Sequence, residues 1–324
     1  MQLPRRQFLH LVVVAAFSAA ARIARADVYP ARAVRIIVGF APGGPADILA
    51  RLVGQWLWER LGQSFIIENR PGGGSNIAVG AVARADPDGY TLLSISSSAF
   101  TNATLYDRLD FNIIRDIAPV ASIAYGAYVM VVNPSTPAKT VPEFIAYTKA
   151  NPGKINMASA GSGSAPHIVG EMFKAMAGVN MLHVPYRGDT PALTDLLAGR
   201  VQVYFSTLPT AIDLIRAGKL RALAVTTAAR SEALPEIPTV GESVPGFEAS
   251  LWHGLGAPRD TPADIVDKLN GEINAALVDP RIKARFAALG ATPHTGSPAD
   301  FGKLIANETE KWAKVIHAAG IKAD

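Results

Sequence analysis

The pattern of hydrophobic positions predicts a strand, a tight loop and a helix near the start of the chain. Residues 34–38 form an apolar run rich in β-branched side chains, which is typical of a buried strand. The glycine-rich stretch 39–44 can extend neither element, and apolar residues at helical spacing begin at Asp47. This junction places unpaired N–H groups and the positive end of a helix dipole together, which favours an anion. Taken alone, an ordinary strand-to-helix turn is the better interpretation.

The same alternation continues through the first third of the chain. Apolar runs at 65–68 and 90–95 predict two further strands, with a helix of small residues at 77–85 between them. The second of these strands ends in Ser96, Ser97 and Ser98. Alternating strands and helices indicate a parallel sheet, whose ligands bind beyond the carboxyl ends of its strands.

The middle of the chain repeats the opening pattern and predicts a second sheet. A strand at 129–134 follows an irregular stretch at 125–127. A short strand then leads into the serine- and glycine-rich loop 159–167 and a helix at 168–177. Further apolar runs predict strands at 182–186, 201–205 and 220–225 and a helix at 193–198.

The last quarter of the chain predicts one strand and then helices only. The strand covers 251–258, and helices follow Asp260, span about 281–289, and run from Pro298 to about His317. Amphipathic helices need a sheet to cover, so we expect this part to return to the first domain. The expected division is domain 1 at 27–127 plus 252–324 and domain 2 at 128–251, joined by two crossovers.

The N-terminal residues predict an export signal. Arg5 and Arg6 precede an apolar run at 11–21, and the A-x-A pattern at 24–26 predicts cleavage near Ala26. The apolar run is too short to span a bilayer, which needs about 20 apolar residues. The arginine pair resembles a twin-arginine signal, and the general secretory route stays an open alternative. We therefore expect a periplasmic protein.

Composition shows that any attraction for anions must be local. Residues 1–26 hold four arginines and no acid, so the remaining chain carries 27 basic and 27 acidic residues. An overall charge that would favour nucleic acid or an anionic membrane is therefore absent. The sequence has no cysteine, which excludes disulfides and thiolate chemistry.

Motifs for catalysis and cofactors are weak. Ser162 or Ser164 with His167 could serve as nucleophile and base of a serine hydrolase, but no G-x-S-x-G motif occurs. The histidines after residue 26 lack metal-binding spacing, and neither G-x-G-x-x-G nor a P-loop occurs. We therefore expect neither an enzyme nor a cofactor.

Several motifs in order along the chain carry a family likeness. The sequence resembles the Bug-type solute-binding proteins of tripartite tricarboxylate transporters. The matching stretches are residues 29–30, 39–47, 68–74, 86–90, 158–164 with His167, 184–188, 191–199 and 252–255.

The resemblance implies a two-lobed periplasmic-binding-protein fold of the Venus flytrap, type II-like kind, with a cleft between two α/β domains. It also implies a small organic carboxylate as ligand and delivery to a membrane transporter with a large and a small integral subunit. A sensor that docks on the ectodomain of a membrane signalling protein is the alternative. By position, the family's site implies that Phe40, Ala41, Gly43, Gly44 and Asp47 face Ser162, Gly163, Ser164, Thr190 and Ala192 across the cleft.

Five further residues are candidates for the same site, namely Ser97, Ser98, His167, Arg187 and Ser206. Many relatives have an acid where Ser206-Thr207 stands, and those that bind amino acids can use it, so an amino-acid ligand is disfavoured. Asp189 would repel a carboxylate unless it points away or meets an ammonium or a hydroxyl group. Arg187 is either a charge partner for the ligand or a turn residue paired with Asp189. Asp47 either contacts ligand-bound water or only caps its helix.

Overall fold

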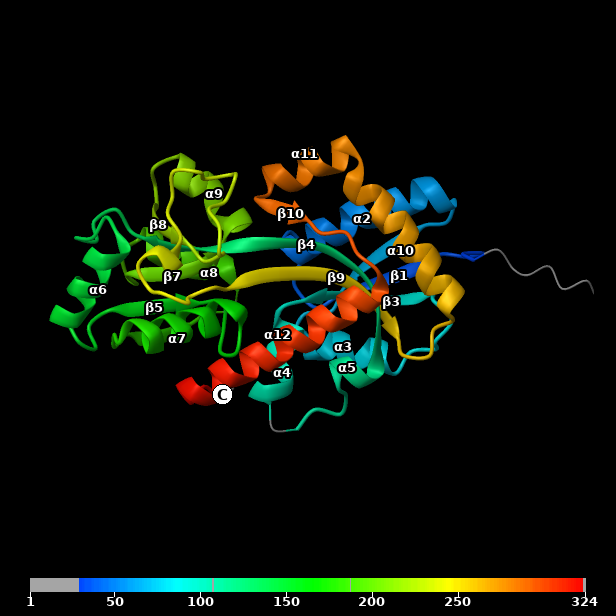
Figure 1. The fold of residues 1–324 in the computed structure, drawn as a ribbon, viewed down its shortest axis with the longest axis horizontal. Coiled ribbons are helices and arrows are strands. Elements are labelled where there is room, and N and C mark those ends of the chain that lie inside the picture. The colour runs from blue at the N-terminus through cyan, green and yellow to red at the C-terminus, as the bar shows by residue number, and fades with distance from the viewer. Residues whose placement is uncertain (1–28, 107, 187, 323–324) are drawn as a thin grey trace, which may run out of the picture.

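The structure is a computed structural model and describes residues 29–106, 108–186 and 188–322 (Figure 1). The export signal expected at residues 1–26 and the candidate Arg187 lie outside the described residues.

Ten strands of the described chain form one sheet, in the order β2-β1-β3-β9-β4-β7-β5-β6, with β8 and β10 also paired to β4. The pairs β1–β2, β1–β3, β5–β6 and β5–β7 are parallel, whereas β9 and β4 are antiparallel to their neighbours. The strands are β1 (Val34–Val38), β2 (Phe65–Asn69), β3 (Thr91–Ser96), β4 (Ile117–Val132), β5 (Asn156–Ser159), β6 (Leu182–Pro185), β7 (Val203–Thr207), β8 (Arg221–Val225), β9 (Ser250–Pro258) and β10 (Ala291–Pro293).

Helices cover both faces of this sheet. In Figure 1, α2, α10 and α11 lie on one face and α3, α4 and α12 on the other. The α-helices are α2 (Pro45–Leu61), α3 (Asn76–Ala83), α4 (Ser98–Leu105), α5 (Ile113–Asp116), α6 (Val141–Ala150), α7 (Ala165–Ala177), α8 (Asp189–Leu197), α9 (Leu208–Arg216), α10 (Ala263–Val278), α11 (Pro280–Ala288) and α12 (Pro298–Ala319), with short 3₁₀ helices η1 (Gly73–Ser75) and η2 (Val240–Glu242).

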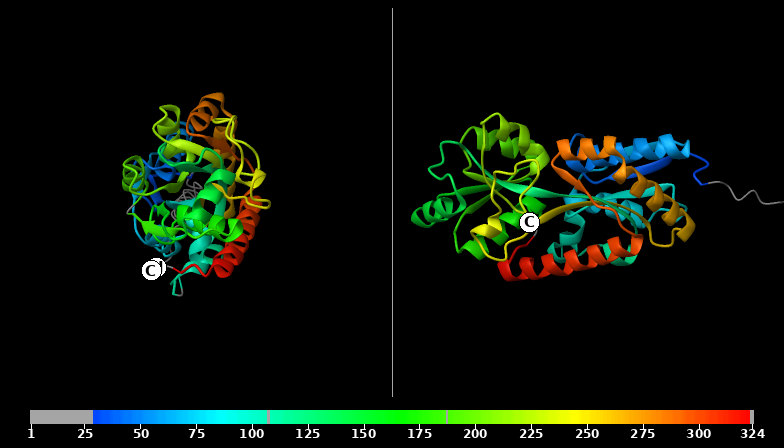
Figure 2. Two further views of the ribbon diagram at one scale, coloured as in Figure 1. Left: turned by 90° about the vertical axis from the view of Figure 1, so that its left-hand side faces the viewer. Right: turned by 45° about the horizontal axis from the view of Figure 1, so that its top comes forward.

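The elements form two lobes that share strand β4 (Figure 2). The first lobe holds β1–β3, β9 and β10 with α2–α5 and α10–α12, and the second holds β5–β8 with α6–α9. Residues 117–127 of β4 pair with β9 in the first lobe, and residues 128–132 pair with β7 and β8 in the second. The two expected sheets are therefore joined into one. The expected domain boundaries stay a prediction.

The prediction of an irregular stretch at 125–127 is wrong, because β4 runs through these residues without a break. Gly126 belongs to the strand, and the carbonyl oxygen of Gly290 lies 3.4 Å from where a Cβ of Gly126 would stand. The turn before β10 is therefore in van der Waals contact with β4 at this position.

Three helices of the described chain were not expected. Ser98–Leu105 forms α4 where the strand was predicted to end in serines, Ile113–Asp116 forms α5, and Leu208–Arg216 forms α9. Most of α4 is buried on all sides, so its residues lack the one-sided apolar pattern by which helices are predicted. Helix α7 also begins earlier than expected, with Pro166 in its first turn, where a missing N–H is no loss.

The last helix, α12, packs against both lobes. It contacts β4 and α4 in the first lobe and α7 in the second, and Figure 2 shows it running along the base of both. Phe301 and Trp312 of α12 share a hydrophobic cluster with Phe173 and Phe247 of the second lobe. Helix α12 thus covers the first-lobe sheet and extends beyond it to the second lobe.

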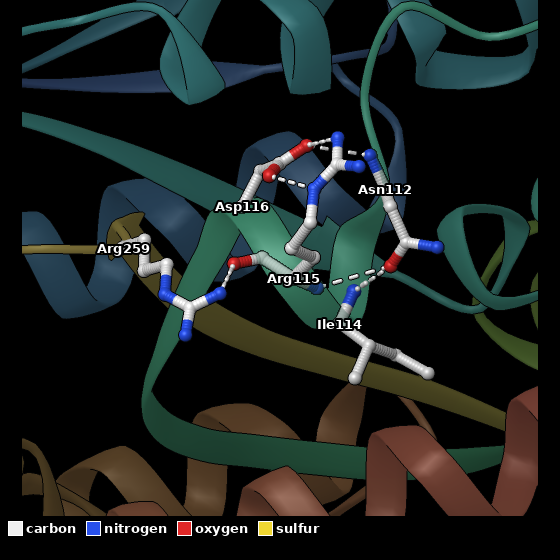
Figure 3. A network of polar contacts seen from close by, with 5 residues as sticks. All are labelled: Asn112, Ile114, Arg115, Asp116 and Arg259. Carbon is white, nitrogen blue, oxygen red and sulfur yellow. Dashed lines mark hydrogen bonds and ion pairs between the residues drawn. The ribbon is translucent and has the colours of Figure 1, made fainter.

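A polar network joins the start of β4 to the end of β9 (Figure 3). The Asp116 carboxylate accepts hydrogen bonds from Arg115 Nε and Nη2 at 2.6 and 2.7 Å and from the Asn112 N–H at 2.7 Å. Arg259 Nη1 donates to the Arg115 carbonyl at 2.9 Å. The hydrogen bond from Arg115 is the main reason why the pKa of Asp116 falls to about 2.

This network makes stability depend on pH. Because the pKa of Asp116 is lower in the folded chain than its ordinary value of 3.8, its stabilisation is present at neutral pH and is lost between about 3.8 and about 2. We expect Asp116→Asn to lower the free energy of unfolding by about 1 kcal/mol or less at pH 7, since the pair is largely exposed. Urea unfolding at pH 7 and pH 3 would measure this difference, which should shrink at the lower pH. Exposed Asp260→Asn is the control, and an Asp116→Asn effect as small as that of the control would contradict the network's role.

Candidate functional site

The carboxyl ends of both parallel strand groups carry the loops that contain the predicted site residues. In the first lobe, β1 is followed by residues 39–44, here called the first-lobe loop, and β3 by Ser97. In the second lobe, β5 is followed by residues 160–164, here called the second-lobe loop. Six helices begin after the carboxyl ends of the strands in these two groups, namely α2, α3, α4, α7, α8 and α9.

The N-termini of these six helices are uncapped by side chains. None of their N-cap residues has a side chain that accepts a hydrogen bond from a backbone N–H of the first turn. Elsewhere in the described chain, side chains of Asn112, Thr140, Asp279 and Ser297 cap α5, α6, α11 and α12, and only α10, after Pro262, lacks one. The uncapped helices therefore collect at the strand ends, where free N–H groups and helix dipoles favour an anion.

Asp47 organises the first-lobe loop. Its buried carboxylate accepts hydrogen bonds from the Gly43 N–H, Arg51 Nε and Asn69 Nδ2, each at 2.9 Å. Burial acts to raise the pKa of Asp47, but hydrogen bonds from Arg51, Gly43 and Asn69 outweigh it and lower the pKa. The carboxylate is thus held ionised inside the loop, and the Gly43 N–H is already used.

The rest of the first-lobe loop is open to solvent. Ala41 and Gly43 are exposed, while Phe40 and Gly44 are partly buried. The Phe40 carbonyl accepts a hydrogen bond from Asn69 at 2.9 Å, which ties this loop to the end of β2. Gly43 has φ of +85°, a conformation that favours glycine.

Two histidines support the second-lobe loop from behind. The Gly163 N–H donates to His167 Nδ1 at 3.1 Å, and the rings of His167 and His183 stack with centroids 3.7 Å apart. His183 Nε2 lies 2.6 Å from Ser159 Oγ, whose hydroxyl also contacts Gly161. His167 therefore holds the loop in shape through its ring nitrogen.

Ser164 has a buried hydroxyl group without a hydrogen-bond partner in the described chain. Ser164 is the N-cap of α7, and its Oγ is buried but makes no hydrogen bond within the described chain. The neighbouring Gly163 lies against α4 of the other lobe, since a Cβ on it would stand 3.4 Å from Leu105 Cδ1. The second-lobe loop thus meets the first lobe at α4.

Other predicted residues are buried in the framework of the site. Ser97 Oγ accepts the Trp252 N–H at 2.7 Å, which fastens the end of β3 to β9, and Ser98 is buried beside it. Ser206 Oγ is buried and donates to the Thr207 carbonyl. Ala192 is fully buried in the second-lobe core, whereas Thr190 is exposed in the first turn of α8.

Asp189 meets a hydroxyl group, one of the two arrangements expected for an acid here. Tyr204 Oη donates a hydrogen bond to Asp189 Oδ1. Burial raises the pKa of Asp189, and the hydrogen bond from Tyr204 only partly offsets this. The expected pairing of Asp189 with Arg187 involves a residue outside the described chain.

Sequence reasoning missed polar groups between the lobes. His253 on β9 and Ser96 on β3 are register partners, and neither the His253 ring nitrogens nor Ser96 Oγ has a hydrogen-bond partner in the described chain. Burial lowers the pKa of His253 to about 4, so its ring is neutral at pH 7. The run Ser96-Ser97-Ser98 at a strand end was the available signal for Ser96.

A small apolar cavity of about 10 Å³ lies where the lobes meet. Pro45 and Leu49 of α2, Pro209 of α9, and Tyr125 and His253 of the shared strands line it. This volume holds about one water molecule. The lobes therefore meet closely at the start of α2 as well as at α4, and the facing of the two loops across a cleft stays a prediction.

The described residues contain neither a cluster of metal-binding side chains nor a membrane-spanning helix. No group of three or more histidine, aspartate or glutamate side chains there could hold a metal ion. No helix in the same part of the chain is long and apolar enough to cross a membrane.

Comparisons with known proteins agree on one family. Residues 49–321 match the family described as "Tripartite tricarboxylate transporter family receptor". The R. palustris protein Rpa4515, solved with adipate, is 38% identical, with a TM-score of 0.86 over 91% of this chain and 99% of that one. The periplasmic binding protein BugD is 34% identical, with a TM-score of 0.84 over 91% and 100%. MatC (Rpa3494) from Rhodopseudomonas palustris, with bound malate, is 32% identical, with a TM-score of 0.82 over 89% and 100%.

The contacts of Asp47 predict its effect on the first-lobe loop. We expect Asp47→Ala to lower the free energy of unfolding by about 1–3 kcal/mol, because the Gly43 N–H and the Asn69 amide lose a buried partner. Urea unfolding at pH 7 would measure this loss. Exposed Asp264→Ala, in the first turn of α10, serves as the control, and equal effects of the two substitutions would contradict the organising role of Asp47.

Proposed function

Since the chain belongs to the tripartite tricarboxylate transporter receptor family, whose members are periplasmic solute-binding proteins with a two-lobed α/β fold, we propose that it captures a small organic carboxylate between its lobes. We further propose that it delivers this di- or monocarboxylate to a membrane transporter with a large and a small integral subunit. Export would follow cleavage of the signal near Ala26, by the twin-arginine or the general secretory route.

The observation that carries the proposal is the distribution of helix caps. Helices that begin at the strand ends lack side-chain caps, whereas nearly all the others have them. Such N-termini leave N–H donors for a ligand anion without any permanent positive charge. Helices α4, α7 and α9 also have no acid in the first turn, so their dipoles are not offset there.

The relatives support the same ligand class. Rpa4515 was solved with adipate and MatC with malate, both of which are dicarboxylates. A site of main-chain N–H groups and hydroxyls suits reversible capture, because charge-assisted hydrogen bonds are strong but an arginine clamp is absent from the described loops. Since the chain after residue 26 is formally neutral, these local dipoles supply the attraction.

A thermal-shift screen tests the proposal directly. Protein unfolded, freed of ligand and refolded would be mixed with a panel of mono-, di- and tricarboxylates. A ligand that binds only the native state at 100 times its Kd adds about 2.7 kcal/mol to the free energy of unfolding, so we expect at least one acid to raise the melting temperature. Matched neutral amides are the controls. An unchanged melting temperature for every acid would contradict carboxylate capture.

Two N-cap serines provide a sharper test. Ser164 Oγ has no partner in the described chain, so Ser164→Ala should leave stability nearly unchanged but weaken carboxylate binding about tenfold through one lost charge-assisted hydrogen bond. Ser297 caps α12 through the Asp300 N–H at 3.1 Å, so Ser297→Ala should cost about 1 kcal/mol of stability and leave affinity unchanged. Calorimetric titration measures the carboxylate affinity of each variant, and urea unfolding measures its stability. Equal affinities in the two variants would remove Ser164 from the site.

A further inference from the structure

We propose that Asp189 selects ligands that carry a hydroxyl or an ammonium group in addition to a carboxylate. The inference rests on the proposed function and adds to it the chemical class of the ligand.

The position of Asp189 places it beside the second-lobe loop. The segment that leads into α8 is hydrogen-bonded to the segment that leaves β5: the Tyr186 N–H donates to the Ser159 carbonyl at 3.0 Å, and the Gly188 N–H donates to the Ala160 carbonyl at 3.1 Å. Asp189 follows directly as the first residue of α8. Gly188, with φ of +108°, makes the sharp turn between them. Asp189 therefore belongs to the same group of loops as Ser164.

Among the described residues, the carboxyl group of Asp189 has no partner of opposite charge. One oxygen accepts a hydrogen bond from Tyr204 Oη, and Tyr204 is itself fully buried. No lysine or arginine of the described chain forms an ion pair with Asp189. The residue is partly exposed, but protein surrounds its carboxyl group closely enough that burial raises the pKa. A carboxylate in this state gains from one more hydrogen-bond donor.

A second aspartate on α8, Asp195, has both a hydroxyl group and a cation as partners. Asp195 Oδ2 accepts a hydrogen bond from Tyr186 Oη at 2.8 Å, and Asp195 Oδ1 accepts one from Arg200 Nη1 at 2.9 Å. These partners, Tyr186 first, lower the pKa of Asp195. Both aspartates thus contact a tyrosine, and among the described residues Asp195 also has a cation whereas Asp189 has none.

The difference in partners between Asp189 and Asp195 determines which ligand groups Asp189 favours. A ligand hydroxyl or ammonium beside Asp189 would supply the missing donor, and an ammonium would also supply the missing charge. A ligand carboxylate in the same place would meet a like charge in a poorly solvated setting. Asp189 therefore favours a ligand hydroxyl or ammonium in this place and disfavours a ligand carboxylate.

Two matched series of acids test the inference by calorimetric titration of the full chain, freed of ligand and refolded. Succinate, malate and aspartate differ only in the group on the second carbon. Adipate, 6-hydroxyhexanoate and 6-aminohexanoate differ only in the group at the far end. In at least one series we expect the acids with a donor to bind about tenfold or more tightly than the acid without it, as a hydrogen bond to a charged group allows.

Substitution of Asp189 should remove this preference. Asp189→Asn can still accept the hydrogen bond from Tyr204 but has no charge, and we expect the ratio of affinities to fall to about threefold or less. Asp189→Ser is the second variant, and a thermal melt checks that each is folded. Asp195→Asn is the matched control on the same helix and should keep the wild-type ratio.

The outcomes separate the two proposals. Wild-type protein that binds carboxylates without preferring a donor in either series, or Asp189 variants that keep the full ratio, would overturn the inference alone. Failure of wild-type protein to bind any acid of the panel would overturn the proposed function and the inference together.

Discussion

The pairing of β4 with both lobes is the constraint on which the rest of the structure depends. One half of this strand pairs with β9, and the other half lies between β7 and β8. Each lobe thus completes its sheet with part of a strand that it shares with the other lobe. Backbone N–H and C=O groups inside a sheet cannot be left unpaired without loss of stability. The lobes can therefore change their relative orientation only where β4 and β9 pass between them.

The attraction for anions at the strand ends comes from local N–H groups, and some of these groups already have hydrogen-bond partners within the chain. Asp47 already uses the Gly43 N–H, so the first-lobe loop offers fewer donors than its glycines predict. The second-lobe loop likewise uses its Gly163 N–H on His167, and Pro166 in the first turn of α7 has no N–H, but the Ser164 hydroxyl has no partner in the described chain. In the proposed site the donors that remain in both loops would hold the carboxylate, and Asp189 would limit what else the ligand can carry.

The sequence predicts the elements better than it predicts the hydrogen bonds of the site. Buried strands such as β1 are evident because β-branched residues cluster in short runs, and the loops are evident from glycine and serine. Helices α4 and α9 were missed because their first residues are serine, threonine and proline, which also form turns. The pairs Gly163–His167 and Asp189–Tyr204 depend on how loops fold against strands, and residue types alone do not reveal those contacts. The family likeness predicts which residues form the site, and it does not reveal their hydrogen-bond partners.

The packing of α12 has a consequence for how the chain acquires its structure. Phe301, Ile305, Trp312 and Ile316 belong to a hydrophobic cluster that also contains Ile37 and Phe173, so it joins residues from nearly opposite ends of the sequence. Such contacts form late, because long stretches of chain must be ordered before they are made. Neither lobe can bury its apolar surface fully until residues 301–316 have been synthesised. The hydrophobic cluster that joins the two lobes is therefore completed only by the last helix of the chain.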